Sequence, residues 1–157
     1  MKQKELSILL RAVVALCAAV ALFFAFAVGT ITIKSILIDQ NWQSCYLVLF
    51  STMFIPLFLS MWDLWRIFTE IGRDNSFCME NAMRLRRISF YALIDTLLVL
   101  VSTVFMLAAD AMDLFEGLFL FKMFLMIVGI AATVACSALS HLTRKAALLK
   151  DENDLTI

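Results

Sequence analysis

The chain has 157 residues, of which 63% are hydrophobic and 17% are charged, and its mean hydropathy is +0.94. A water-soluble domain of this size usually has an apolar content near half and a charged content near a quarter, so the composition excludes an ordinary soluble domain and indicates a membrane protein. One Pro and four Gly leave little sequence for a flexible linker, and no repeat is evident, so we expect a single domain over residues 1–157.

The first long apolar stretch covers residues 12–33 without a charge and follows Lys4 and Arg11. It is longer than the ~20 residues that cross a ~30 Å hydrocarbon core, so it predicts a membrane span. A cleaved signal peptide is the alternative, because a basic start, an apolar stretch and the small residues Ala25 and Ala27 resemble its three parts. The apolar stretch continues past that site, which favours an uncleaved span.

A short polar connection follows, with Asp39 to Asn41 at its centre. The second predicted span covers residues 46–68 and contains Pro56 near its middle. A proline at this position removes one helical hydrogen bond and usually kinks the helix, which neighbouring helices in a membrane can tolerate. We expect a structural kink, with a functional hinge as the alternative.

A long polar segment, residues 69–87, separates this span from the third, which covers residues 88–109. Gly72 to Ser76 holds residue types that end one helix and cap the next, so the segment predicts a cap made from two helix ends and a turn. The cap is rich in arginine, and Arg66 lies just before it.

The acidic residues Asp110, Asp113 and Glu116 form a predicted turn after the third span. The fourth span covers residues 117–142, and Lys122 is close enough to its outer end to extend back to the interface. A polar tail, residues 143–157, ends the chain.

The distribution of cations predicts the topology. If both termini and the cap face the cytoplasm, every Lys and Arg except Lys34 and Lys122 lies on the cytoplasmic side, which is the bias that the positive-inside rule describes. We therefore predict an all-α, integral membrane four-helix bundle in the plasma membrane, with both termini cytoplasmic.

The sequence contains no recognisable catalytic motif. It has no P-loop, HExxH, GxSxG or dinucleotide-binding pattern, and its one histidine argues against most triads and metal sites. The four cysteines have no metal-binding spacing, and only Cys45 is expected on the oxidising side, so we expect buried or interfacial thiols. We expect neither an enzyme nor a bound cofactor or metal.

Two carboxylates near the predicted membrane boundary are the sharpest candidates for chemistry, because a charge at membrane depth is costly. Asp63 can pair with Arg66 three positions along the same helix. Tyr91, Asp95 and Ser102 share a stripe on the third span. A second stripe on the fourth span contains Thr133, Ser137 and either Ser140 or His141.

We expect these stripes to face each other and to form interhelical hydrogen bonds, each worth less than ~2 kcal/mol. The alternative is a proton or ion relay through Asp63 and Asp95. A relay should continue to the outer face, yet the outer halves of the spans are almost wholly apolar. For His141 we expect a solvated helix-end residue beside Arg144, with a proton sensor as the alternative.

The polar cap and tail form a second candidate site, a surface for docking a partner. It could bind anionic lipid head groups, dock a cytosolic protein, or serve only to orient the chain in the membrane. Acidic residues dilute its charge, which favours a structured surface that faces a partner. The candidate docking residues are Arg73, Glu80, Asn81, Arg84, Arg86, Arg87, Asp151, Glu152, Asn153 and Asp154.

Three segments carry a resemblance to a known family: FCMEN at residues 77–81, RLRRI at 84–88 and LKDENDLTI at 149–157. They resemble the signatures of the YoaS-like family of bacterial membrane proteins, known as domain of unknown function 2975, and the resemblance covers nearly the whole chain. Members often have Gly-Pro before the Phe and Ser or Thr after it. This chain has Asn75-Ser76 and Cys78 there, a difference that concerns the capping of the helix.

The resemblance implies a four-span membrane protein without an assigned activity, often found beside a small helix-turn-helix transcription regulator. The expected function is therefore that of a regulatory partner that holds such a cytosolic protein at the membrane, without contacting nucleic acid itself. A small transporter or channel subunit that uses the intramembrane carboxylates is the alternative. The sequence leaves the oligomeric state open.

Overall fold

A computed structural model of the chain describes residues 3–38, 42–73, 76–108 and 116–154. Every regular element in these ranges is helical: α1 is Gln3–Ile38, α2 Trp42–Thr52, α3 Phe54–Ile71, α4 Met79–Ala108 and α5 Glu116–Asp154. Four stretches are long and apolar enough to cross a membrane, Lys4–Ile31, Leu47–Ile71, Met79–Ala108 and Phe119–Lys150. The predicted all-α class is confirmed, with four helical stretches that could span a membrane.

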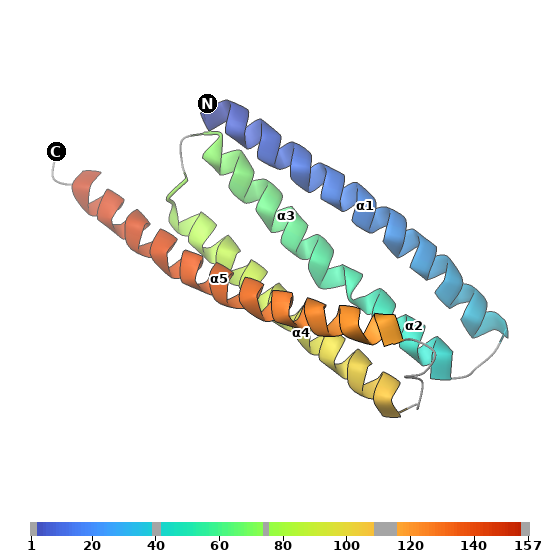
Figure 1. Ribbon diagram of the computed structural model, residues 1–157. Helices are drawn as coiled ribbons and strands as arrows, with labels where there is room; N and C mark the ends of the chain where they lie inside the picture. Colours follow the sequence, from blue (N-terminus) through green and yellow to red (C-terminus); the bar gives the residue numbers. More distant parts are fainter. Residues whose placement is uncertain (1–2, 39–41, 74–75, 109–115, 155–157) are drawn as a thin grey trace.

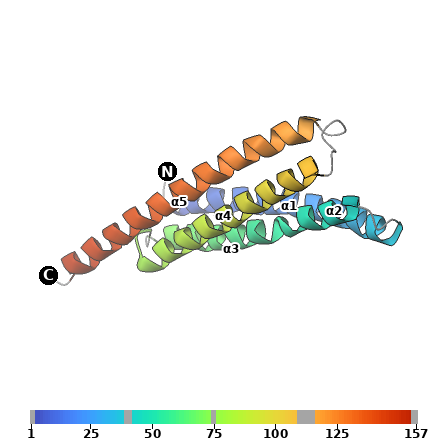
Figure 2. The ribbon, with the colours of Figure 1, turned by 90° about the horizontal axis from the view of Figure 1, so that it is seen from below.

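The helices form an open row, in which α4 contacts α2, α3 and α5 (Figure 1). The neighbours in the row are α1 and α3, then α3 and α4, then α4 and α5, while α2 touches α1, α3 and α4. Among the described helices α5 contacts α4 alone, and Figure 2 shows it lying outside the layer formed by α1, α2 and α3. A surface cleft can therefore form along α4 and α5 without a third helix covering it.

Large apolar side chains cover the outside of the row. Phe23, Phe26, Leu120 and Ile127 are each more than 60% exposed, which costs nothing where lipid is the solvent. Helices in a membrane associate through small and polar residues that allow close approach. The buried side chains of α4 accordingly include Ser89, Ser102 and Thr103 as well as Val99 and Met106.

The second span is interrupted, since α2 ends at Thr52 and α3 begins at Phe54. Pro56 explains the position of the break, because a proline ring clashes with the carbonyl four residues earlier, which is that of Thr52. Placed in the first turn of α3, Pro56 leaves no helical hydrogen bond unmade. The two segments lie end to end in Figure 1, so the proline produces a local break inside one span.

Two glycines allow neighbouring helices to approach closely. A Cβ on Gly72 would lie 2.6 Å from Ser7 Oγ, and the hydroxyl of the fully buried Ser7 donates to the Phe68 carbonyl at 2.6 Å, which joins α1 to α3. A Cβ on Gly129 would lie 2.2 Å from Thr96 Oγ1, where α4 meets α5.

The first turns of α1 and α4 and the last turns of α3 and α5 lie at one end of the row (Figure 1), which we call the basic end. At ~1.5 Å per residue, the 39 residues of α5 extend about 58 Å and the 30 residues of α4 about 45 Å. Both exceed the ~30 Å thickness of the hydrocarbon core. The excess length allows helix segments at the basic end to project beyond it.

Parts of three predicted segments lie outside the described residues. They are the connection at Asp39 to Asn41, the capping residues Asp74 and Asn75, and the acidic turn at Asp110 and Asp113. The last three residues of the tail also lie outside them.

Candidate functional site

A groove at the basic end lies between α4 and α5 and has a volume of about 570 Å³. One wall is formed by α4 residues with the spacing i, i+3, i+4 and i+7, and α5 forms the other wall with the same spacing. These intervals place four side chains on one face of each helix. The lining residues are Met79, Ala82, Met83, Arg86, Ser137, Ser140, His141 and Arg144.

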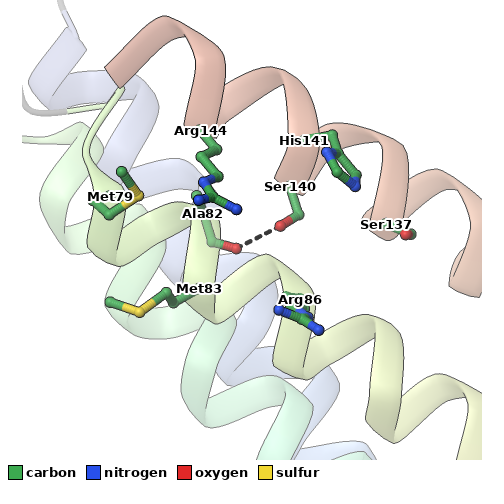
Figure 3. A pocket seen from close by; sticks show the side chains of 8 residues that line it. All are labelled: Met79, Ala82, Met83, Arg86, Ser137, Ser140, His141 and Arg144. Carbon is green, nitrogen blue, oxygen red and sulfur yellow. Dashed lines mark hydrogen bonds between the residues drawn. The ribbon is translucent and has the colours of Figure 1, made fainter. Parts of the chain in front are cut away.

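A hydrogen bond joins the two helices that form the walls of the groove. The Ser140 hydroxyl donates to the Ala82 carbonyl at 2.7 Å (Figure 3). One turn or more further into the membrane, the Ser89 hydroxyl donates to the Thr133 carbonyl at 2.8 Å. Both donors are small side chains that bond to the backbone of the facing helix, so they hold the two helices at close distance and set the width of the groove.

The chemistry of the groove is cationic and partly apolar. Arg86 and Arg144 are exposed and form no ion pair with any described residue, and none of the described lining residues is a carboxylate. Met79 and Met83 supply apolar surface that adapts to different shapes. The hydroxyl of Ser137 and the imidazole of His141 add further hydrogen-bonding groups. This combination suits an acidic segment that also carries apolar side chains.

Several of the predicted docking residues instead hold the start of α4 together. Arg84 is 5% exposed and donates to Asn81 Oδ1 at 3.0 Å and to Glu80 Oε1 at 2.5 Å. Asn81 is 1% exposed and donates to the Ser76 carbonyl at 3.2 Å. A partner cannot contact Asn81 or Arg84 without unfolding this turn.

The start of α4 has a cap that the sequence reasoning did not identify. The backbone N–H of Asn81 donates to Cys78 Sγ at 3.4 Å, and the N–H of Ala82 donates to the Cys78 carbonyl at 3.2 Å. Sulfur is a weak acceptor, which makes Cys78 an unusual residue in this place. Ser or Thr, the usual capping residues, would accept a stronger bond.

Asp63 does not pair with Arg66. It is 4% exposed and accepts a hydrogen bond at 2.9 Å from Arg87, which lies on α4. The Arg66 guanidinium instead lies 5.5 Å from the ring centroid of Trp62, close enough for a cation–π contact. Asp63 faces α4 rather than the surface of its own helix, so the cation from the neighbouring helix reaches it. This ion pair also removes Arg87 from the freely available docking residues.

The predicted facing stripes make fewer contacts with each other than expected. Ser102 donates to the Val99 carbonyl of its own helix at 2.9 Å, whereas Ser137 and His141 are exposed. Asp95 is partly buried, and its Oδ1 atom has no hydrogen-bond partner among the described residues. The Tyr91 hydroxyl forms no hydrogen bond within the described part of the chain. There, the hydroxyls of Ser89 and Ser140 join α4 to α5.

Lys122 differs from its predicted position, because it points inward. It is 3% exposed, and its Nζ atom donates to the Ser102 carbonyl at 3.2 Å. The acceptor is a backbone carbonyl of α4, the neighbouring helix. The Lys122 side chain therefore makes a hydrogen bond inside the bundle instead of extending to the membrane–water interface.

The remaining predicted docking residues lie at the edges of the basic end. Arg73 is exposed and forms an ion pair with Glu70 at 3.3 Å. Glu152 and Asn153 are exposed on the last turns of α5, which also include Asp151 and Asp154. Sequence reasoning missed Met79, Met83 and Arg144 as lining residues. The repeated i, i+3, i+4, i+7 spacing could have identified each wall but not their pairing.

Among the described residues, no group of three His, Cys, Asp or Glu side chains could hold a metal ion. All four cysteines are free thiols, Cys17 and Cys45 exposed and Cys78 and Cys136 partly buried. The polar binding groups of the groove are therefore arginine guanidinium groups, serine hydroxyls and the His141 imidazole.

The family signature extends over the groove and most of the chain. A family described as "Protein of unknown function (DUF2975)" matches residues 12–157. The chain belongs to this family. The matched region includes both helices that line the groove, so the groove is part of the DUF2975 region. No curated protein and no solved structure matches the chain.

Proposed function

We propose that this DUF2975 protein is a docking platform that holds a cytosolic protein at the membrane through the groove between α4 and α5. The observation that carries the proposal is the exposed pair Arg86 and Arg144 beside Met79 and Met83, in a groove whose described lining residues include no carboxylate. An acidic, partly apolar segment of a partner complements such a surface.

The proposed partner comes from the resemblance of the chain to the YoaS-like family. In the YoaS-like family of bacterial membrane proteins, a small helix-turn-helix transcription regulator is often found beside the membrane protein. We propose that such a regulator is the docked protein, and that docking keeps it from DNA. This function requires binding and release, and it assigns no reaction to the chain.

The proposal requires the basic end to face the cytoplasm of a plasma membrane, as the positive-inside rule predicts. Cys45 and Cys78 offer a test of this topology. Cys45 lies just before the second span and Cys78 just before the third, so the two thiols should lie on opposite sides of the membrane. In variants that retain only one of them, a membrane-impermeant maleimide should label Cys45 in intact cells and Cys78 only after lysis. Labelling of Cys78 in intact cells would contradict both the topology and the docking of a cytosolic protein.

A photo-crosslinking residue at position 83 tests docking directly, because Met83 lines the groove and is 56% exposed. We expect a crosslink to a small cytosolic DNA-binding protein in intact cells, identified by mass spectrometry. The same protein, fused to a fluorescent reporter, should lie at the membrane. Reversal of one groove charge in Arg144→Glu should release it to the cytosol, with about tenfold weaker binding for a loss of ~1.4 kcal/mol.

Lys145→Glu is the matched control, since Lys145 is the next residue on α5, is exposed and does not line the groove. It changes the charge equally and should leave the reporter at the membrane. A reporter that stays at the membrane with Arg144→Glu, or leaves it equally with both variants, would count against docking in the groove.

A small transporter or channel subunit is the second candidate function. The observation that favours it is Asp95 Oδ1, which has no hydrogen-bond partner among the described residues. Asp63 is less available, because it is paired with Arg87. If transport is the function, Asp95→Asn should abolish an ion flux in proteoliposomes. If docking is the function, the same variant should retain the crosslink at position 83.

A further inference from the structure

A second site lies at the basic end, on the seam between α1 and α3 and away from the α4–α5 groove. A pocket of about 300 Å³ opens there and is lined by Lys4, Ile8, Arg11, Thr69, Gly72 and Arg73. Its volume is at the lower limit of ligand pockets, which range over ~300–1,000 Å³. The close approach of the helices at Gly72 and Ser7 forms one end of this region.

The pocket carries an excess of positive charge. Lys4 and Arg11 form no ion pair with any described residue, although Arg11 Nε donates to the Ser7 carbonyl at 3.4 Å. Arg73 is paired with Glu70 at 3.3 Å, but its side chain is 70% exposed, so the pair is solvated and weak. Three cations thus line the pocket, and none of its described lining residues is a carboxylate, so the pocket suits an anion.

The same seam continues into the membrane as an apolar groove of about 400 Å³. On α1, Val14, Ala15 and Ala18 follow Arg11 at helical spacing and leave room because two of them are alanines. On α3, Phe58 and Met61 belong to the opposite wall. The spacing puts the pocket and the groove on one face of each helix.

The tryptophans mark the level of the membrane boundary along the seam. Trp62 and Trp65 line the apolar groove and are 62% and 41% exposed. Tryptophan is enriched at the level of the lipid head groups, between the hydrocarbon core and water. The cationic pocket thus lies on the water side of these rings, and the apolar groove extends from them toward the hydrocarbon core.

We propose that this seam binds one anionic phospholipid. Its phosphate lies in the pocket formed by Lys4, Arg11 and Arg73, and one acyl chain lies in the groove over Ala15 and Ala18. A basic pocket between membrane helices is a known arrangement for anionic head groups. The α4–α5 groove has no comparable apolar continuation among its lining residues, which distinguishes the lipid site from the protein-docking site.

The head-group half of the proposal is tested with the purified full-length chain in micelles that contain equal amounts of phosphatidylglycerol and phosphatidylcholine. Native mass spectrometry should show one retained phosphatidylglycerol. Replacing two cations in Arg11→Gln/Arg73→Gln should weaken its retention about 30-fold, or about 2 kcal/mol at ~1 kcal/mol per cation. The control Arg86→Gln/Arg144→Gln removes the same charge at the basic end and should leave retention unchanged.

The acyl-chain half is tested by filling the groove. Ala18→Trp should reduce retention of phosphatidylglycerol at least tenfold, whereas Ala19→Trp, which puts the same ring on an exposed position of α1 outside the groove, should not. Circular dichroism and size-exclusion chromatography confirm that each variant is folded.

Three outcomes would overturn the proposal. Equal retention of the two lipids, or equal losses with the two arginine pairs, would show only nonspecific attraction to the basic end. Unchanged retention in Ala18→Trp, with soluble glycerol phosphate competing fully, would show a site for a free anion and not for a phospholipid. These outcomes leave the docking of a protein between α4 and α5 unaffected, because that test uses other residues.

Discussion

The ion pair between Asp63 and Arg87 predicts an asymmetric response to mutation. The side chain of Asp63 is 6% exposed, whereas that of Arg87 is 53% exposed. Arg87→Met leaves a buried carboxylate without its cation. Asp63→Asn leaves an arginine that can turn to water, and Asn keeps an oxygen in the place of Oδ1. Removal of the arginine should therefore destabilise the protein more than removal of the charge on its partner.

The expected loss of stability follows from how deeply the two side chains are buried. Removing one member of a fully buried pair costs about 3–5 kcal/mol, and the half-exposed Arg87 reduces this to about 2 kcal/mol, because water already solvates part of the pair. For Asp63→Asn we expect ~1 kcal/mol or less, the net value of an ordinary hydrogen bond. The double variant should cost about 1 kcal/mol less than the sum of the two single variants.

The measurement is reversible unfolding by SDS in mixed micelles, followed by tryptophan fluorescence, since Trp62 and Trp65 lie on α3 close to Asp63 in sequence. Arg86→Met is the control, because Arg86 is exposed and unpaired among the described residues, and it should change stability by no more than ~0.5 kcal/mol. Equal losses of stability in Asp63→Asn and Arg87→Met, or losses that simply add in the double variant, would refute the predicted asymmetry.

Two further predictions concern the contact between α4 and α5. Gly129→Ala should cost ~1–3 kcal/mol, because its Cβ would lie 2.2 Å from Thr96 Oγ1 and a β-branched side chain in a helix has few rotamers. Adding Thr96→Ala should restore most of that loss, while Gly29→Ala, with nothing within 4 Å, should be neutral or slightly stabilising. Lys122→Met should unfold at the same or a higher SDS fraction than the native chain, because a buried Met has a similar length and needs no hydrogen-bond partner, and the Ser102 carbonyl remains within α4. A clear loss in Lys122→Met, or no rescue by Thr96→Ala, would show that these contacts are assigned incorrectly.

The four spans could be predicted from the sequence because the requirement is local. Each needs about 20 consecutive apolar residues, with backbone hydrogen bonds made inside the segment, and the chain contains four such stretches. Pro56 predicted an irregularity in the second span for the same reason, since a proline disturbs its own turn. The break at Met53 is the local consequence.

The partners of the polar residues depended on which helices lie side by side, and helical spacing within one segment does not carry that information. Arg66 lies three positions after Asp63 on the same helix, which is the spacing of a possible ion pair. Asp63 nevertheless pairs with Arg87, because packing directs its carboxylate toward α4. The same packing buries Lys122 against Ser102 and directs the hydroxyls of Ser89 and Ser140 to the backbone of the facing helix.

The sequence by itself determined the solvent of this protein, because apolar content and segment length decide whether a chain is more stable in lipid than in water. Only the tertiary structure decided which arginines are free to bind something. Of the arginines at 84, 86 and 87, two are held by neighbours and Arg86 alone points into the groove with Arg144. The physical reason is that the charge of a side chain belongs to the residue, whereas its availability depends on the acceptors that folding brings within reach.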